Sequence, residues 1–145
     1  MKVYRGLKDP RLKRSPRSVA IGIFDGVHRG HRKILERALL AARRLRVRPM
    51  AVTFEPHPQK VLSGNKHAPK VLMSLEHRLR LFGELGMKET LVIPFTKKFA
   101  GASHQDFLYG LLLHKLGMKA LSVGDDFRFG HRALGDRHYL EEESR

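Results

Sequence analysis

No cysteine occurs among the 145 residues of the chain. Disulfide bonds, thiolate nucleophiles and cysteine-ligated zinc are therefore excluded, and the absence agrees with a reducing compartment. Long hydrophobic runs are also missing, since no segment has the length of a transmembrane helix and residues 1–17 are polar and basic, unlike a secretory signal peptide. We expect a cytoplasmic protein without a membrane segment.

The glycine-rich loops by which many proteins bind nucleotides are absent too, because neither G-x-G-x-x-G nor G-x-x-x-x-G-K-[ST] occurs. Acidic residues are few: 14 Asp and Glu stand against 29 Lys and Arg, which gives a formal net charge of +15. This excess attracts polyanions of any kind, whether nucleotides, nucleic acids or acidic lipids. We interpret the basic clusters mainly as solvated surface. They comprise Lys8, Arg11, Lys13, Arg14 and Arg17, and Arg43, Arg44, Arg46 and Arg48.

Strand and helix patterns alternate along the chain. Short apolar runs typical of buried strands lie at residues 19–24, 50–54, 90–95 and 120–123. Helical spacing of apolar residues is found at 31–46, 74–86 and 103–117. Ser74 and Ser103 are the expected N-caps of the last two helices, and Gly86 and Gly117 their expected ends.

This order predicts a single α/β domain over residues 1–145. We expect a Rossmann-like, mostly parallel sheet with helices on both faces. Residues 55–73 are expected to form a long loop or a short helix. Ligands of such a fold bind where the carboxyl ends of the strands open a crevice.

The most specific stretch is G-I-F-D-G-V-H-R-G-H at residues 22–31, between the first strand pattern and the first helix pattern. His28 and His31 stand at the mouth of that helix, where free backbone N–H groups and the helix dipole attract phosphate. Both imidazoles can donate hydrogen bonds to phosphate oxygens and stabilise a departing phosphate. The alternative, a helix cap or a surface patch, is disfavoured by the strand, turn and helix around the pair.

Two further motifs follow other predicted strands. F-E-P-H-P at residues 54–58 ends the second strand with a rigid turn around His57, which can form a wall of the crevice. G-D-D-F-R-F-G at residues 124–130 follows the fourth strand. Asp125 and Asp126 could together attract Mg²⁺, although paired acidic residues in loops are more often solvated.

Together, the three motifs resemble the adenylyltransferase module of the prokaryotic bifunctional riboflavin kinase/FAD synthetases, within the nucleotidylyltransferase superfamily. The family patterns are G-x-F-D-G-V-H-x-G-H, F-[ED]-P-H-P and G-x-[DN]-F-x-F-G, and the resemblance extends over about residues 3–136. Other members of the superfamily share only the histidine signature, so the second and third motifs narrow the choice. The resemblance implies transfer of AMP from ATP to FMN, which gives FAD and pyrophosphate with Mg²⁺.

The resemblance also implies roles for individual residues. His28 and His31 would bind the ATP phosphates and stabilise the leaving group. The remaining residues of the ATP site would be Gly22, Phe24, Asp25, Gly30 and Asp126, with Asp126 beside the metal. The flavin site would comprise Pro56, His57, Pro58, Arg128 and Phe129, with Phe129 against the flavin ring and Phe127 in the core. Leu62 occupies a position where some members carry an aromatic residue near the flavin.

The family module continues into a Ser/Thr-containing turn and an arginine that grips the ATP phosphates, and we find neither this segment nor a riboflavin kinase module. We therefore expect residues 1–145 to be an FMN adenylyltransferase-like domain that lacks its C-terminal part. Two other functions stay open: a catalytically incomplete flavin- or nucleotide-binding domain and, less favoured, a basic nucleic-acid-binding module.

Overall fold

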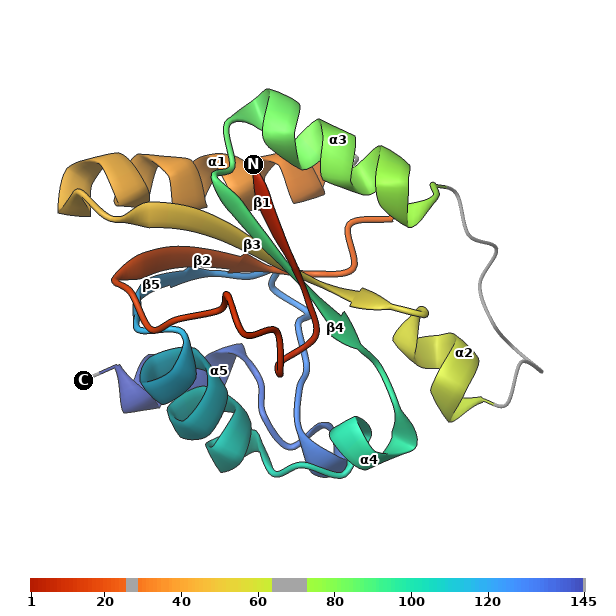
Figure 1. Cartoon of the computed structure of the whole chain (residues 1–145). Helices are drawn as coiled ribbons and strands as arrows, with labels where there is room; N and C mark the ends of the chain where they lie inside the picture. The colour runs from red at the N-terminus through yellow and green to blue at the C-terminus, as the bar shows by residue number, and fades with distance from the viewer. Residues whose placement is uncertain (26–28, 64–72, 145) are drawn as a thin grey trace.

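The computed structural model describes residues 1–25, 29–63 and 73–144. Within these residues, five strands form one sheet in the order β1-β4-β3-β2-β5, and each pairing between neighbours is parallel. The predicted parallel α/β architecture is thus confirmed (Figure 1). The strands are β1 (Lys2–Arg5), β2 (Arg17–Ile21), β3 (Arg48–Glu55), β4 (Glu89–Pro94) and β5 (Met118–Ser122).

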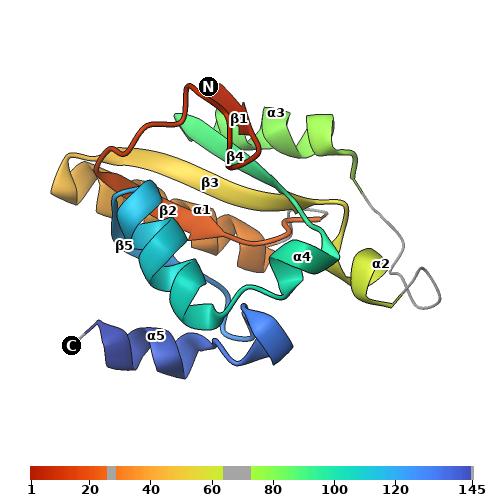
Figure 2. The same cartoon turned by 60° about the horizontal axis from the view of Figure 1, so that its bottom comes forward.

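Helices cover both faces of this sheet, as predicted (Figures 1 and 2). α1 and α3 lie on one face, while η1 and α5 lie on the other. α2 and α4 lie beyond one end of the sheet, where β3 and β4 terminate (Figure 1). The helices are α1 (Arg29–Leu45), α2 (Pro58–Leu62), α3 (Leu75–Leu85), α4 (Lys97–Ala100), η1 (Asp106–Lys115), η2 (His131–Ala133) and α5 (Arg137–Glu143).

The strands divide their side chains between two cores, because successive residues of a strand point to opposite faces. In β2, Val19 and Ile21 join the core beneath η1, whereas Ala20 joins the core beneath α1 and α3. β3 alternates in the same way, with Val52 in the first core and Ala51 in the second. Burial on both faces explains why these strands read as continuous apolar runs.

β1 is not predicted from the sequence. Tyr4 is its one buried residue, and the strand lies at the edge of the sheet, where it pairs with β4. Four residues with two exposed basic ends carry little of the apolar signal from which a strand is predicted.

Two predicted helices carry the expected caps. The Ser74 hydroxyl accepts a hydrogen bond from the His77 N–H (3.1 Å), and Gly86 ends α3 with a φ of 112°. The Ser103 hydroxyl accepts from the Asp106 N–H (3.0 Å) at the start of η1. η1 is wound as a π-helix rather than the α-helix expected, and the Leu116 N–H donates to the Leu111 carbonyl (3.0 Å). Apolar spacing does not distinguish these two windings.

Arg17 corrects the interpretation of its cluster as solvated surface. Its side chain is 1% exposed and forms an ion pair with Glu89 (2.9 Å). Its Nη1 also donates to the Leu116 carbonyl (2.8 Å). The pair joins the first residues of β2 and β4 and therefore closes the amino end of the sheet.

Candidate active site

A cavity of about 690 Å³ opens beyond the carboxyl ends of β2 and β5. The chain passes from β2 to β3 on one side and later places β5 on the other, so this is the switch point where parallel α/β sheets bind ligands. Residues of all three motifs line the cavity: Gly22 and His31, His57 and Pro58, and Asp126, Arg128 and Phe129.

The turn after β2 is built around Phe24. Its φ is 57°, and its fully buried ring packs against the rings of Phe82 (5.3 Å between centroids) and His31 (5.6 Å). A Cβ on Gly22 would lie 3.0 Å from the Phe24 ring, so a glycine is needed for this packing. Phe24 does not line the cavity, because its ring belongs to the core beneath α1 and α3, but it contacts His31 at the cavity wall. Its expected part in shaping the ATP site stays a prediction.

The helix that follows carries one of the two predicted histidines into the cavity. α1 begins at Arg29, so His31 lies in its first turn and is half-buried at the cavity wall. Gly30 lies in the same turn and is exposed. The Asp25 carboxylate accepts a hydrogen bond from the Met73 N–H (2.8 Å), just before α3. His28 falls outside the described residues.

The Pro-His-Pro turn after β3 contributes the opposite wall. His57 caps α2, and its Nδ1 accepts a hydrogen bond from the Gln59 N–H (3.1 Å). Burial lowers the pKa of His57; the Arg78 charge also lowers it, while the Asp25 and Glu55 carboxylates oppose the shift. This shift favours the neutral ring, and because Nδ1 accepts, the proton of the neutral form is on Nε2. Pro56 is half-buried, and only His57 and Pro58 of this turn belong to the cavity lining.

The burial of the two phenylalanines after β5 is the reverse of that expected, while the flavin contact of Phe129 stays a prediction. Phe129, expected against the flavin, is 7% exposed, packs on Phe107 (4.9 Å between centroids) and belongs to the core beneath η1. Phe127, expected in the core, is only partly buried and stacks on Phe129 (5.5 Å). Both rings line the cavity. Phe129 is anchored because its backbone pairs with Gly135.

The two neighbouring acidic residues point to different surroundings. Asp126 lines the cavity, whereas Asp125 forms an ion pair with Arg137 of α5. The two carboxylates therefore do not face one common site, contrary to the expectation that they attract Mg²⁺ together. Among the described residues, no three His, Asp or Glu side chains are grouped so as to hold a metal ion. Arg128 lines the cavity with a side chain 63% exposed and lies 3.7 Å from the Asp136 carboxylate.

Sequence reasoning misses Arg78, which lies beneath the site. This α3 residue is 3% exposed and donates hydrogen bonds to groups at the ends of both β2 and β3. An arginine in an amphipathic helix gives no sign of burial. The contacts that bury it come from residues at least 23 positions away in the chain.

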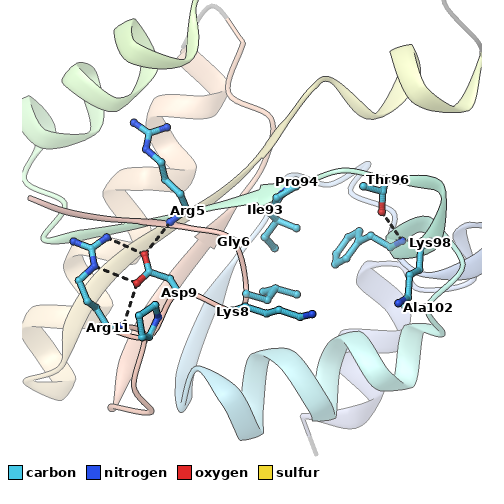
Figure 3. Close-up of a pocket in the computed structure, with 13 residues that line it drawn as sticks. Arg5, Gly6, Lys8, Asp9, Arg11, Ile93, Pro94, Thr96, Lys98 and Ala102 are labelled. Atoms are coloured by element: carbon cyan, nitrogen blue, oxygen red, sulfur yellow. Dashed lines mark hydrogen bonds and ion pairs between the residues drawn. The ribbon is translucent and has the colours of Figure 1, made fainter.

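A second cavity, of about 970 Å³, lies between the segment after β1 and α4 (Figure 3). Its walls include Ile93, Pro94 and Phe99, with Lys8 and Lys98 also in the lining. Asp9 accepts hydrogen bonds from Arg11 at its edge, which hold the pKa of that carboxyl well below its usual range. It contains no residue of the three motifs, so we place the active site in the other cavity.

No helix among residues 1–25, 29–63 and 73–144 combines the length and apolar character needed to cross a bilayer. The parallel sheet and the crevice at its switch point define a Rossmann-like α/β protein that binds its ligand at the carboxyl ends of the strands. A solved structure described as a macrolide-efflux protein from Streptococcus pneumoniae has the same fold, with a TM-score of 0.81 and 23% identity over 98% of this chain and 47% of its own.

A family model for FAD synthetase matches residues 11–145, and the chain belongs to that family. A bifunctional riboflavin kinase/FMN adenylyltransferase of Escherichia coli (strain K12) is 39% identical over 94% of this chain and 44% of its own length. The protein of the same name in Buchnera aphidicola subsp. Schizaphis graminum is 33% identical over 98% of this chain and 45% of its length. The chain thus spans less than half the length of these relatives.

Proposed function

We propose that this chain is an FMN adenylyltransferase, which binds ATP and FMN in the cavity beyond β2 and β5 and joins them to form FAD. The observation that carries the proposal is the convergence of His31, His57 and Asp126 on one cavity of about 690 Å³. These residues come from three motifs far apart in the sequence. Membership in the FAD synthetase family supports the same reaction.

In the proposed reaction, a phosphate oxygen of FMN attacks the α-phosphorus of ATP. A new P–O bond forms there, the bond to the oxygen bridging the α- and β-phosphates breaks, and pyrophosphate leaves with the electron pair. A phosphate nucleophile needs no activated serine or cysteine. The protein has to align two polyanions and stabilise the charge that develops on the leaving group.

His31 is suited to the ATP side of the cavity. It lies in the first turn of α1, where the positive end of the helix dipole favours phosphate. Its imidazole can donate a hydrogen bond that strengthens as charge develops on pyrophosphate. We propose that His28 acts with it and that Gly22, Asp25 and Gly30 shape the same site.

The opposite wall is suited to FMN. The partly buried Phe127, supported by Phe129, offers an aromatic surface to a flat ring. The Nε2–H of His57 is a donor at this wall, next to Pro58. The exposed guanidinium of Arg128 suits the phosphate of FMN. Pro56 is proposed to set the direction of this turn.

Asp126 is the residue proposed to hold Mg²⁺. It brings one carboxylate to the cavity, and Mg²⁺ is usually held by one or two carboxylates together with substrate phosphates and water. The donor set therefore fits the ion. When bound, Mg²⁺ neutralises phosphate charge.

The test is FAD formation from FMN, ATP and Mg²⁺ by the purified chain, followed by chromatography. His31→Ala should lower the rate by about 10²-fold, the usual effect of removing one donor to a developing charge. His114→Ala, which changes an exposed histidine of η1, is the matched control and should leave the rate unchanged. Equal rates of FAD formation in the parent chain and in His31→Ala would reject the assignment of His31 and its cavity to this reaction.

The alternatives give different results in the same preparation. Binding of ATP and FMN by calorimetry without FAD would identify a catalytically incomplete binding domain. Binding of RNA or DNA with steep salt dependence, and no competition by ATP, would favour the nucleic-acid module instead.

A further inference from the structure

One guanidinium contacts the ends of two neighbouring strands. Arg78 Nη1 donates to the Ile23 carbonyl (2.8 Å) and to the Thr53 hydroxyl (2.9 Å), and Nη2 donates to the Glu55 carboxylate (2.6 Å). The Thr53 hydroxyl in turn donates to the Ile23 carbonyl (3.0 Å). Arg78 therefore joins the backbone that leaves β2 to the last residues of β3.

These contacts precede the two walls of the active site. Ile23 lies two residues before Asp25 in the histidine motif, and Glu55 lies immediately before the Pro-His-Pro turn. The same end of α3 also holds Asp25, through the Met73 N–H (2.8 Å). The first turn of α3 and the residue before its cap thus contact both the segment after β2 and the end of β3, which belong to different motifs.

We infer that Arg78 is a positioning residue, which fixes the separation between the nucleotide wall after β2 and the flavin wall after β3. This inference rests on the proposed function. Transfer of AMP requires the FMN oxygen to approach the α-phosphorus in line with the leaving oxygen. Misplacement of a reacting group by about 1 Å can cost about 10²-fold in rate.

Arginine is suited to this position because of its shape as well as its charge. The planar fork directs its two terminal nitrogens toward separate acceptors, whereas a lysine has one ammonium nitrogen on a flexible stem. Lysine would keep the positive charge beside Glu55 and could reach one wall, but it would not hold both in one geometry.

The first experiment measures kcat and both KM values for FAD formation by Arg78→Lys and Arg78→Met. We expect kcat to fall by about 10²-fold in Arg78→Met, with much smaller changes in KM, and only partial recovery in Arg78→Lys. Full activity in Arg78→Lys would overturn the inference, because charge alone would then suffice. A rise in KM with kcat unchanged would also overturn it.

Two controls separate positioning from stability. Arg80→Met changes an exposed arginine of the same helix and should have parental kinetics. The double variant Arg17→Met/Glu89→Leu removes the buried arginine at the other end of the sheet together with its partner, and should also keep kcat.

If Arg78→Met does not fold, Thr53→Val removes the second link to Ile23 and should also lower kcat. A parental kcat in Thr53→Val would then overturn the inference.

Hydrogen exchange supplies a measurement that does not depend on turnover. Arg78→Met, or Thr53→Val in its place, should increase exchange in peptides covering both residues 22–25 and residues 54–58, whereas the Arg17→Met/Glu89→Leu control should not. If the parent chain makes no FAD, the proposed function fails. Hydrogen exchange then still tests whether Arg78 couples the two turns. Unchanged exchange in either turn would overturn the inference.

Discussion

The two ends of the sheet each contain a buried arginine, but the arginines have different surroundings. Arg17 at the amino end pairs with Glu89, whose side chain is only 2% exposed, and the pair joins regular strands. Arg78 at the carboxyl end pairs with Glu55, whose side chain is 47% exposed, and it binds segments that leave the strands. The first pair closes the sheet, while the second orders the turns that line a cavity. Buried charge therefore serves stability at one end and the active site at the other.

The largest expected effect is on stability, at the amino end. Arg17→Met leaves the Glu89 carboxylate buried with its main partner removed, which should lower the free energy of unfolding by about 3–5 kcal/mol. Urea denaturation measures the loss.

The double variant Arg17→Met/Glu89→Leu tests the cause of that loss. Removing both charges should recover most of it, because no uncompensated charge stays buried. A double variant as unstable as the single one would show that packing of the arginine stem, rather than charge, holds the amino end together.

At the carboxyl end, Gly22→Ala should act on activity as well as stability. The new methyl group would meet the Phe24 ring at 3.0 Å, and overpacking of this kind costs about 1–3 kcal/mol. Because the Phe24 ring contacts that of His31, its displacement should also lower the rate of FAD formation. Thermal unfolding and steady-state rates measure the two effects.

Gly110→Ala is the matched control, since a Cβ at that position of η1 would meet nothing within 4 Å. It should leave the rate of FAD formation close to that of the parent and raise the stability slightly, by about 0.4–1 kcal/mol. A Gly22→Ala chain that is destabilised but fully active would separate Phe24 packing from the site.

A smaller effect is expected at the cap of α3. Ser74→Ala removes the acceptor for the His77 N–H and should cost about 1 kcal/mol. FAD formation should fall modestly, because Met73, the donor to Asp25, directly precedes the cap. Ser74→Asp keeps an N-cap acceptor and should restore both stability and rate. No recovery in Ser74→Asp would argue against the cap.

The parts of this molecule that are predictable from sequence depend on neighbours along the chain. The caps at Ser74 and Ser103 involve residues three positions apart, and each motif directly follows an apolar run. Parallel strands then bring all three motifs to one edge, so their convergence on one cavity is also predictable. This is why the fold and the convergence of the motifs follow from the sequence.

The parts that are missed depend on contacts distant in the chain. Arg17 meets Glu89 across 72 positions, and Arg78 meets Ile23 across 55, so neither arginine differs locally from a solvated one. The reversed burial of Phe127 and Phe129 has the same origin, because the pairing of Phe129 with Gly135 decides which ring is anchored. The burial of the Phe24 ring is missed for the same reason, because it depends on the packing of the ring against Phe82 in α3.

The smallest expected effect is on the pKa of His57. It allows the charges of Arg17 and Arg78 to be compared at one titrating group. Burial lowers the pKa of His57 below its ordinary value of 6.5, and the Arg78 charge lowers it further. The unfolded chain therefore binds this proton more readily than the folded one. The contribution of His57 to stability is complete above pH 6.5 and is lost as the pH falls toward the folded pKa.

Titration of the His57 ring by NMR checks this order. Arg78→Met should raise the pKa of His57, because a nearby positive charge is removed while the Asp25 and Glu55 carboxylates stay. Arg17→Met/Glu89→Leu should leave that pKa unchanged, since neither residue of the amino-end pair is among the charges that act on His57. Equal shifts in both variants would mean that the two ends of the sheet are coupled. An upward shift in Arg78→Met alone would confirm that Arg78 acts on the flavin wall through charge as well as through its hydrogen bonds.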